Sequence, residues 1–485
     1  MHLFDGNIFY PATNTFAYSD ATLLQGLIAA PLLWAHLSPS LVYNLLLLVG
    51  FVGSGVGMYV LARHLTGEIW PALVATMVFT ALPYRVEHLM HLEMQWAMFI
   101  PLSLWAAHRT AESGRWRYGA LLGLFLWLQF LSCLYYGVFL ALTLVLFTPL
   151  LLTLKDRVPA SAFLLPLFFG AGLAALLTVP YVLPYLEASK VVGTRPLEEM
   201  LRYSAHPISY LAASEFNRVW GWTANLWGSQ ELRLFPGLVA VLIACASWNH
   251  PWRRLVVVYG VTTLVGVQLS FGLNGWLYTV LLAHVTPLQG FRAMSRFGIV
   301  VGCTIALLAA LGAQAILVRV TWTPFWKRTS VVAIMSVMLI EYSNRAIPLS
   351  FAVDETPPDA YVALRSGAPG AIVEFPLPDR ESLPGWDPYY QAWSLWHWRP
   401  MLNGYSGFYA IPYLEALTEL KAFPDERSVT ALRARHVRYA IVHRGFYEDG
   451  QYTPIALKMA ATPGLKVWGT FKDPVGLADI LEIEP

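Results

Sequence analysis

Long runs of apolar residues recur over the first 340 positions, and they constrain the fold more than any other feature. A helix needs about 20 apolar residues, or about 17 at the least, to cross the hydrocarbon core of a bilayer. Several of the runs are short, and 70–82 and 94–107 in particular need flanking residues or a tilt. The first run, 22–37, could lie along the interface instead. The runs are 22–37, 41–61, 70–82, 94–107, 118–132, 137–154, 160–184, 234–247, 255–273, 298–318 and 330–341.

Composition agrees with a membrane protein. Of the 485 residues, 56% are hydrophobic and only 13% are charged, whereas a soluble domain carries about 25% charged residues. This balance excludes an ordinary soluble enzyme and an intrinsically disordered chain. The formal net charge of +2 argues against nucleic acid as a partner. The three cysteines lie in apolar runs and form no disulfide framework.

The distribution of Lys and Arg predicts about ten spans that begin and end outside. Alternate loops are rich in basic residues, and these loops are expected inside. Those residues are Arg63, Arg109, Arg115, Arg117, Lys155, Arg157, Arg253, Arg254, Arg319, Lys327 and Arg328. We therefore expect a multi-pass protein of the plasma membrane, with the C-terminal part on the extracytoplasmic side.

The fold class expected is mainly α. A transmembrane helix bundle, residues 1–340, precedes a small extracytoplasmic α/β or α+β domain, residues 341–485. In that domain 371–375 and 439–443 have the pattern of buried strands, and 413–423 and 427–436 that of helices. Because no apolar segment precedes Asp5, we expect a helix upstream of this sequence in the natural protein.

Two aspartates lie in the first polar stretch. A carboxylate beside a membrane surface can act as a general base or bind a cation, and Asp5 is the candidate here. A solvated turn explains Asp5 equally well. For Asp20 we favour a structural role as the N-cap of the following helix.

A second candidate site lies between two short apolar runs, in the segment Tyr84–Glu93. On a helix Glu87, His88 and His91 share one face. Such a face can position an acceptor hydroxyl or hold a divalent cation, although an interfacial helix with a wet face would show the same residues.

A third candidate, Arg292 and Arg296, precedes the long apolar run at 298–318. Guanidinium groups near a helix N-terminus suit a phosphate or pyrophosphate. Lys190, Arg195 and Arg202 could contribute to the same anion site. The simpler alternative is that both arginines extend toward lipid headgroups.

Across nearly its whole length the sequence resembles the GT-C-type membrane glycosyltransferases, and more closely bacterial membrane proteins of uncertain activity related to them. The matching stretches are Asn7–Pro11, Tyr18–Asp20, Pro83–Arg85 with His88, His91, Gln95–Trp96 and Pro101, Tyr135–Gly137, Arg292–Phe297 and Asn403–Phe408. The resemblance implies a polytopic helical fold with an external domain. It also implies that a carboxylate of the first external loop activates the acceptor, and Asp5 is the position that matches.

The leading hypothesis is therefore a glycosyltransferase, a hexosyltransferase, that moves a sugar from a polyprenyl-phosphate donor to an extracytoplasmic glycan, lipid or protein acceptor. In it Asp5 is the catalytic base, Glu87, His88 and His91 position the acceptor or a divalent cation, and Arg292 and Arg296 bind the donor phosphate. The alternative is a non-catalytic carrier or assembly scaffold for lipid-linked saccharides in the cell envelope.

Overall fold

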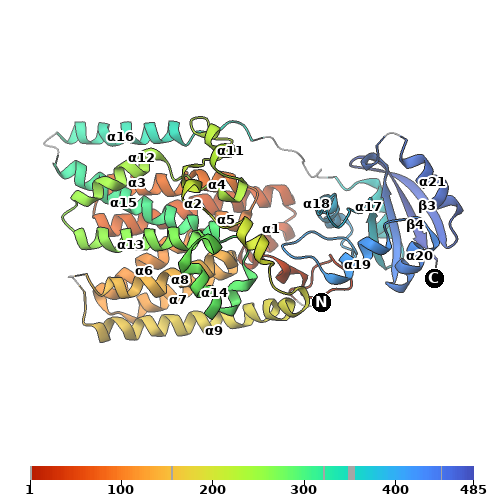
Figure 1. Cartoon of the computed structure of the whole chain (residues 1–485), viewed down its shortest axis with the longest axis horizontal. Helices are drawn as coiled ribbons and strands as arrows, with labels where there is room; N and C mark the ends of the chain where they lie inside the picture. The colour runs from red at the N-terminus through yellow and green to blue at the C-terminus, as the bar shows by residue number, and fades with distance from the viewer. Residues whose placement is uncertain (1–2, 155–156, 320–322, 348–355, 449, 485) are drawn as a thin grey trace. The chain divides into compact units, whose positions relative to one another are not determined.

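The computed structural model describes residues 3–154, 157–319, 323–347, 356–448 and 450–484. It is mainly helical, with 66% of its residues in helices, and it contains one four-stranded sheet (Figure 1). The chain divides into two compact units. Unit 1 comprises Met1–Ala21, Val182–Gly193 and Leu349–Pro485, and unit 2 comprises Thr22–Tyr181 and Thr194–Pro348.

Unit 2 is built from helices joined by short turns. Its helices are α1 (Leu23–Trp34), α2 (Pro39–Thr66), α3 (Ile69–Thr80), α4 (Pro83–Glu87), α5 (Leu92–Gln95), α6 (Phe99–Ser113), α7 (Trp116–Ser132), α8 (Leu134–Leu151), α9 (Ala160–Val192, whose end belongs to unit 1), α10 (Leu197–Arg202), α11 (Ala224–Trp227), α12 (Leu238–Ala246), α13 (Arg253–Ser270), α14 (Trp276–His284), α15 (Gly298–Arg319) and α16 (Pro324–Glu341). Its 3₁₀ turns include η4 (Gln230–Leu232) and η8 (Met294–Phe297).

Within the described residues, five helical segments are long and apolar enough to cross a membrane, which supports the membrane class predicted from the sequence. They are Pro39–Thr66, Ile69–Glu87, Leu134–Leu151, Ala160–Val192 and Met294–Arg319. The other predicted runs lie on shorter or more polar helices, namely α1, α6, α7, α12, α13 and α16. That these helices also cross the membrane stays a prediction.

The helix α15 is the most buried of the five, because small residues line it. A side chain at Gly312 would lie 1.8 Å from the carbonyl oxygen of Ile243 in α12, and one at Gly302 would meet Leu82 at 2.5 Å. Glycines and alanines let helix backbones approach closely where hydrophobic association is weak. The helix therefore serves as the packing centre of unit 2.

Several loops that were predicted to share one side of the membrane meet at one end of unit 2. His64 contacts Glu112 at 2.9 Å, and Gln314 donates to the carbonyl oxygen of Thr66 at 2.7 Å. Gln314 also lies 3.0 Å from the His250 ring. These contacts connect the ends of α2 and α6 with the last two turns of α15, and the side of the membrane on which they lie stays a prediction.

Unit 1 contains a mixed sheet with the strand order β1-β2-β4-β3. Strands β1 (Ala371–Phe375) and β2 (Val437–His443) are parallel, and β3 (Leu465–Asp473) and β4 (Gly476–Ile483) form an antiparallel hairpin. Its helices are α17 (Asp359–Ser366), α18 (Asp387–Trp393), α19 (Ile411–Glu419), α20 (Glu426–Ala434) and α21 (Tyr452–Ala461).

The two strands predicted in this region are confirmed, and β2 begins two residues before the predicted start. The two predicted helices are present with shifted ends. Helix α20 begins at Glu426 because Asp425 accepts a hydrogen bond from the backbone of Ser428, which forms a capping box. Helix α19 ends at Glu419, four residues before the predicted end.

The free edge of β1 is covered by two further extended segments. Ile372 donates to the carbonyl oxygen of Pro400 and accepts from Leu402, both at 2.8 Å. On the other side of that segment Tyr10 donates to Met401 at 2.8 Å and Phe9 donates to Asn403 at 3.0 Å. Residues 7–10 thus extend the sheet, and no unpaired edge is left at β1.

We expect Phe9→Ala to weaken this pairing strongly. Phe9 is fully buried between Tyr18, Tyr409 and Tyr413, and removing a buried aromatic ring costs about 3–5 kcal/mol. Hydrogen exchange of the amides of Met401 and Leu402, which donate to Asn7 and Ile372, measures the effect in detergent micelles. Leu3→Ala, which removes an exposed side chain, is the control, and equal protection in both variants would contradict the assignment.

Candidate functional site

Two segments that are far apart in the sequence bring five predicted site residues together in unit 2. Glu87 ends α4 and His91 precedes α5, whereas Arg292 and Arg296 precede α15. The predicted single helical face is wrong, because the helix ends at Glu87 and His88–His91 form a turn. The side chains of Glu87, His88 and His91 still lie in one common region of unit 2. We call Glu87, His88, His91, Glu199, Glu231, Arg233, Arg292 and Arg296 the polar cluster.

The pair formed by Arg296 and Glu231 lies at the centre of the polar cluster. Arg296 donates to both carboxylate oxygens, at 2.7 and 3.2 Å. Its guanidinium also lies 4.9 Å from the centre of the Tyr135 ring. The Nε2 atom of His88 is 3.9 Å from Glu231. The segment that contains His88 and His91 and the arginine segment, which contains Arg292 and Arg296, therefore meet at this carboxylate.

A second buried ion pair fixes Glu87. Arg233 donates to Glu87 at 2.6 Å, and both side chains are buried. The same guanidinium donates to Glu215 at 3.2 Å and to Asn225 at 2.8 Å. Arg233 follows η4, the turn that carries Glu231, so one short segment supplies partners for both halves of the cluster.

Arg292 is the more accessible of the two predicted arginines. Its side chain is 31% exposed, compared with 7% for Arg296. It donates to Glu199 at 2.9 Å, and its backbone N–H donates to the Tyr135 hydroxyl at 3.2 Å. Arg195, which was predicted to contribute to the anion site, pairs with the same Glu199 at 3.3 Å. Arg195 and Arg292 therefore share one carboxylate.

Burial controls the charge of the imidazole groups. It lowers the pKa of His88 to about 3, although Glu231 acts in the opposite direction. Burial also lowers the pKa of His91. For Glu231 burial alone would raise the pKa, but the charge of Arg296 and the hydrogen bond from it hold the pKa well below its usual value. Both histidines are therefore neutral near pH 7.

The cluster balances its charges. Arg233, Arg292 and Arg296 are each paired with a carboxylate, from Glu87, Glu199 and Glu231 respectively. A phosphate group at either predicted arginine would therefore share or displace an existing partner. Five guanidinium N–H donors per arginine leave capacity for such sharing.

Several buried atoms of the cluster lack a hydrogen-bond partner among the described residues. They include both ring nitrogens of His88, Nδ1 of His91 and the hydroxyl of the neighbouring Ser295. Buried polar atoms are nearly always hydrogen-bonded, to protein or to water. These atoms can accept from or donate to the hydroxyl groups of water or of a ligand.

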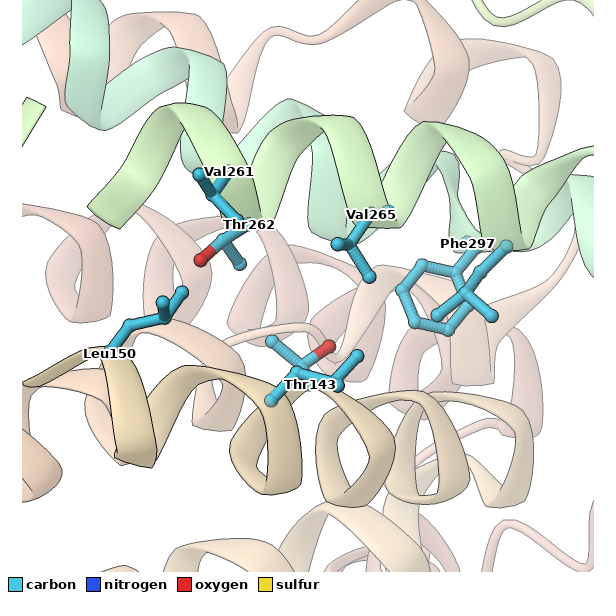
Figure 2. A pocket seen from close by; sticks show the side chains of 9 residues that line it. Thr143, Leu150, Val261, Thr262, Val265 and Phe297 are labelled. Atoms are coloured by element: carbon cyan, nitrogen blue, oxygen red, sulfur yellow. The ribbon is translucent and has the colours of Figure 1, made fainter. Parts of the chain in front are cut away.

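An apolar cavity of about 160 Å³ lies next to the arginine segment. Figure 2 shows Thr143 and Leu150 of α8 facing Val261, Thr262 and Val265 of α13, with Phe297 at one end. Phe297 follows Arg296 directly in the sequence. The cavity and the polar cluster are thus joined through adjacent residues.

Asp5, the predicted base, lies in unit 1. Its carboxylate accepts a hydrogen bond from the backbone N–H of Asn14 at 2.8 Å, which orders the first loop. Lys190 also belongs to unit 1, and Arg202 is exposed on α10. The cap predicted for Asp20 is wrong, because α1 begins at Leu23 and Thr22 is its N-cap residue.

The sequence did not identify Glu199, Glu231 or Arg233. All three lie in the polar stretch between the apolar runs 160–184 and 234–247. Charged residues that directly flank an apolar run were the available signal. Among the described residues no group of three or more His, Cys, Asp or Glu side chains is placed to hold a metal ion.

Comparison with known proteins gives no family assignment. No protein-family model matches the chain, and no curated protein is significantly similar to it in sequence.

We expect Glu87→Gln to destabilise unit 2 by about 3–5 kcal/mol, because it leaves the buried charge of Arg233 without its closest partner. Glu112→Gln breaks the more exposed pairs with His64 and Arg109 and should cost about 1 kcal/mol or less. Thermal unfolding in detergent micelles compares the two variants. Equal shifts in the two variants would mean that the buried pair contributes no more than the exposed ones.

Proposed function

We propose that this chain is a membrane glycosyltransferase that transfers a sugar from a polyprenyl-phosphate donor to an acceptor on the outer face of the membrane. The observation that carries the proposal is the polar cluster, in which Glu87, His88, His91, Arg292 and Arg296 converge at the ends of two candidate membrane spans. Ionisable side chains at such positions are costly to bury and are commonly functional.

The polar cluster suits a reaction that releases a lipid-bound phosphate. Negative charge develops on the leaving phosphate, and fixed donors that face it lower the barrier. Arg292 is suited to this role because its side chain is partly exposed and, among the described residues, Glu199 is the one carboxylate that accepts from it, at 2.9 Å. Arg296 would contribute through the N–H groups that Glu231 does not occupy.

The neutral imidazoles suit the sugar hydroxyls. A neutral ring offers one donor and one acceptor, which matches a hydroxyl group better than a second cation does. The apolar cavity beside Phe297 offers space for apolar atoms of a lipid close to the arginines. Asp5 remains the proposed base, by the family resemblance.

Arg292→Ala should reduce transfer from a polyprenyl-phosphate sugar by about 100-fold or more, the usual cost of losing one charge-stabilising donor. Arg296→Ala should abolish transfer. Turnover in proteoliposomes measures both effects. Arg253→Ala is the matched control, because Arg253 is an exposed arginine at the start of α13.

The outcomes separate the two hypotheses for the chain. Unchanged turnover in the Arg292 and Arg296 variants would remove their assignment to the donor phosphate. Thermal stabilisation of the wild-type chain by the polyprenyl-phosphate sugar, without any turnover, would favour the carrier or scaffold instead.

Asp5→Asn tests the base separately. The amide oxygen of asparagine can still accept the hydrogen bond from Asn14, so the loop should keep its order while the base is lost. We expect turnover to fall by at least about 100-fold, with an unchanged melting temperature. Full activity in this variant would limit Asp5 to its role in ordering the loop.

A further inference from the structure

A chain of buried ionisable groups crosses the sheet of unit 1. His443, the last residue of β2, lies between Asp473 and Glu374, with its Nδ1 2.6 Å from Asp473 and its Nε2 2.7 Å from Glu374. All three side chains are fully buried. Ionised carboxylates only accept hydrogen bonds, so the imidazole donates from both nitrogens and carries a positive charge.

A third carboxylate, Asp387, begins α18 nearby and is also fully buried. Asn403 donates to its Oδ1 at 3.1 Å, and the Tyr413 hydroxyl donates to its Oδ2. Burial raises the pKa of Asp387 to about 7, and the charge of Glu374 acts in the same direction, against the two hydrogen bonds.

These three carboxylates outnumber the cations that face them. Among the described residues no lysine or arginine donates to Glu374, Asp387 or Asp473, and His443 is their one charged partner. His397, 4.0 Å from Glu374, is neutral, because burial and the charges of Arg399 and Arg365 lower its pKa to about 3. The remaining titratable neighbours of these carboxylates are the phenol groups of Tyr361, Tyr390, Tyr413 and Tyr447.

Asn403 connects this carboxylate cluster to the edge of the sheet. Its side chain accepts from the backbone N–H of Glu374 at 2.7 Å and donates to the carbonyl oxygen of Glu374 at 3.0 Å. Its own carbonyl oxygen accepts from Phe9. One residue therefore contacts Asp387, strand β1 and the N-terminal segment.

We propose that the carboxylate cluster of Glu374, Asp387 and Asp473 is a proton-binding site that tightens the pairing of residues 7–10 and 399–403 with β1 in acid. When Asp387 is neutral, the cluster holds two carboxylates against the His443 cation. When Asp387 ionises, a third negative charge is confined beside Glu374 without a cation of its own. Repulsion between the carboxylates then favours opening of the segment that Asn403 holds.

The direction of the pH dependence follows from the two raised pKa values. Between the ordinary value of 3.8 and about 7 the folded unit retains a proton on Asp387 that the open form releases. Burial disfavours the charged form of His443, but its bonds to Asp473 and Glu374 outweigh this and raise its pKa above 6.5. For Asp387 the closed form is therefore disfavoured progressively as the pH rises from about 3.8 to about 7. His443 acts in the same direction above its ordinary pKa of 6.5, so both groups favour the closed form in acid. His397 acts in the opposite direction, but only below pH 6.5.

Hydrogen exchange of the full chain in detergent micelles at pH 6 and pH 8, corrected for the intrinsic exchange rate, tests the proposal. The protection factors of the amides of Met401, Leu402 and Asn403 should be higher at pH 6 than at pH 8, and the proton that Asp387 retains contributes about tenfold to this ratio. Asp387→Asn should lower this ratio, because the amide does not titrate. Asp379→Asn, which removes an exposed carboxylate of the same unit, should leave the ratio as in the wild type.

A second variant keeps the proposal testable if Asp387→Asn fails to fold. Tyr413→Phe removes a hydrogen bond to the ionised Asp387, so the midpoint of the pH transition should move to higher pH. A ratio near one in the wild-type chain would overturn the proposal. An equal ratio in the wild type and Asp387→Asn, or an unmoved midpoint in Tyr413→Phe, would also overturn it.

Discussion

Charge buried next to apolar helices must be paired, and this requirement organises the end of unit 2 that carries the polar cluster. Transfer of an isolated guanidinium or carboxylate out of water costs several kcal/mol even after relaxation. Arg233 and Arg296 avoid most of this cost because Glu87 and Glu231 accept from them at 2.6 and 2.7 Å. Their partners come from different segments, so the ion pairs also fix the loop around η4 against α4 and η8. Replacement by apolar residues would relieve the desolvation cost, and for that reason stability alone does not explain these pairs.

The packing of the helices makes this arrangement possible. Helix α15 follows the arginine segment directly and is held close to α12 by small residues such as Gly312. Its start is therefore fixed in position, and Arg296 in η8 is fixed with it. In the same way α8 begins at Leu134, so Tyr135 lies beside both Arg292 and Arg296. Rigid helix ends thus set the geometry of side chains that would otherwise be free to reach the headgroups.

The sequence predicted those features that leave a local pattern. The apolar runs mark the helices, and the strands β1 and β2 are short apolar segments between turn residues. That His88 and Arg296 meet at Glu231 could be anticipated only as a shared position at one border of the membrane. The partners Glu231 and Arg233 lie in an irregular stretch without periodicity, and no local signal connects them to α4. Asp20 shows the same limit, since a plausible cap depends on a helix start that lies two residues further on.

The pairing of residues 7–10 with 399–403 joins two segments that are far apart in the sequence, and no local sequence pattern predicts it. Asn7–Pro11 and Asn403–Phe408 were separate stretches of the family resemblance, and in unit 1 they lie against each other, since a side chain at Gly404 would meet Phe9 at 2.8 Å. Gly404 is thus explained by packing against the first loop. Packing between the two stretches therefore accounts for their residues, and neither stretch needs a role in catalysis to explain it.

The two buried polar systems differ in how they respond to protons. The cluster of unit 2 is balanced by arginines, which do not titrate in the physiological range, and its buried histidine His88 stays neutral down to a pH of about 3. The cluster of unit 1 contains no arginine partner among the described residues and is balanced by one imidazole, the side chain that titrates most readily near neutrality. Acidity can therefore change the first loop and its sheet while the polar cluster of unit 2 keeps its charge.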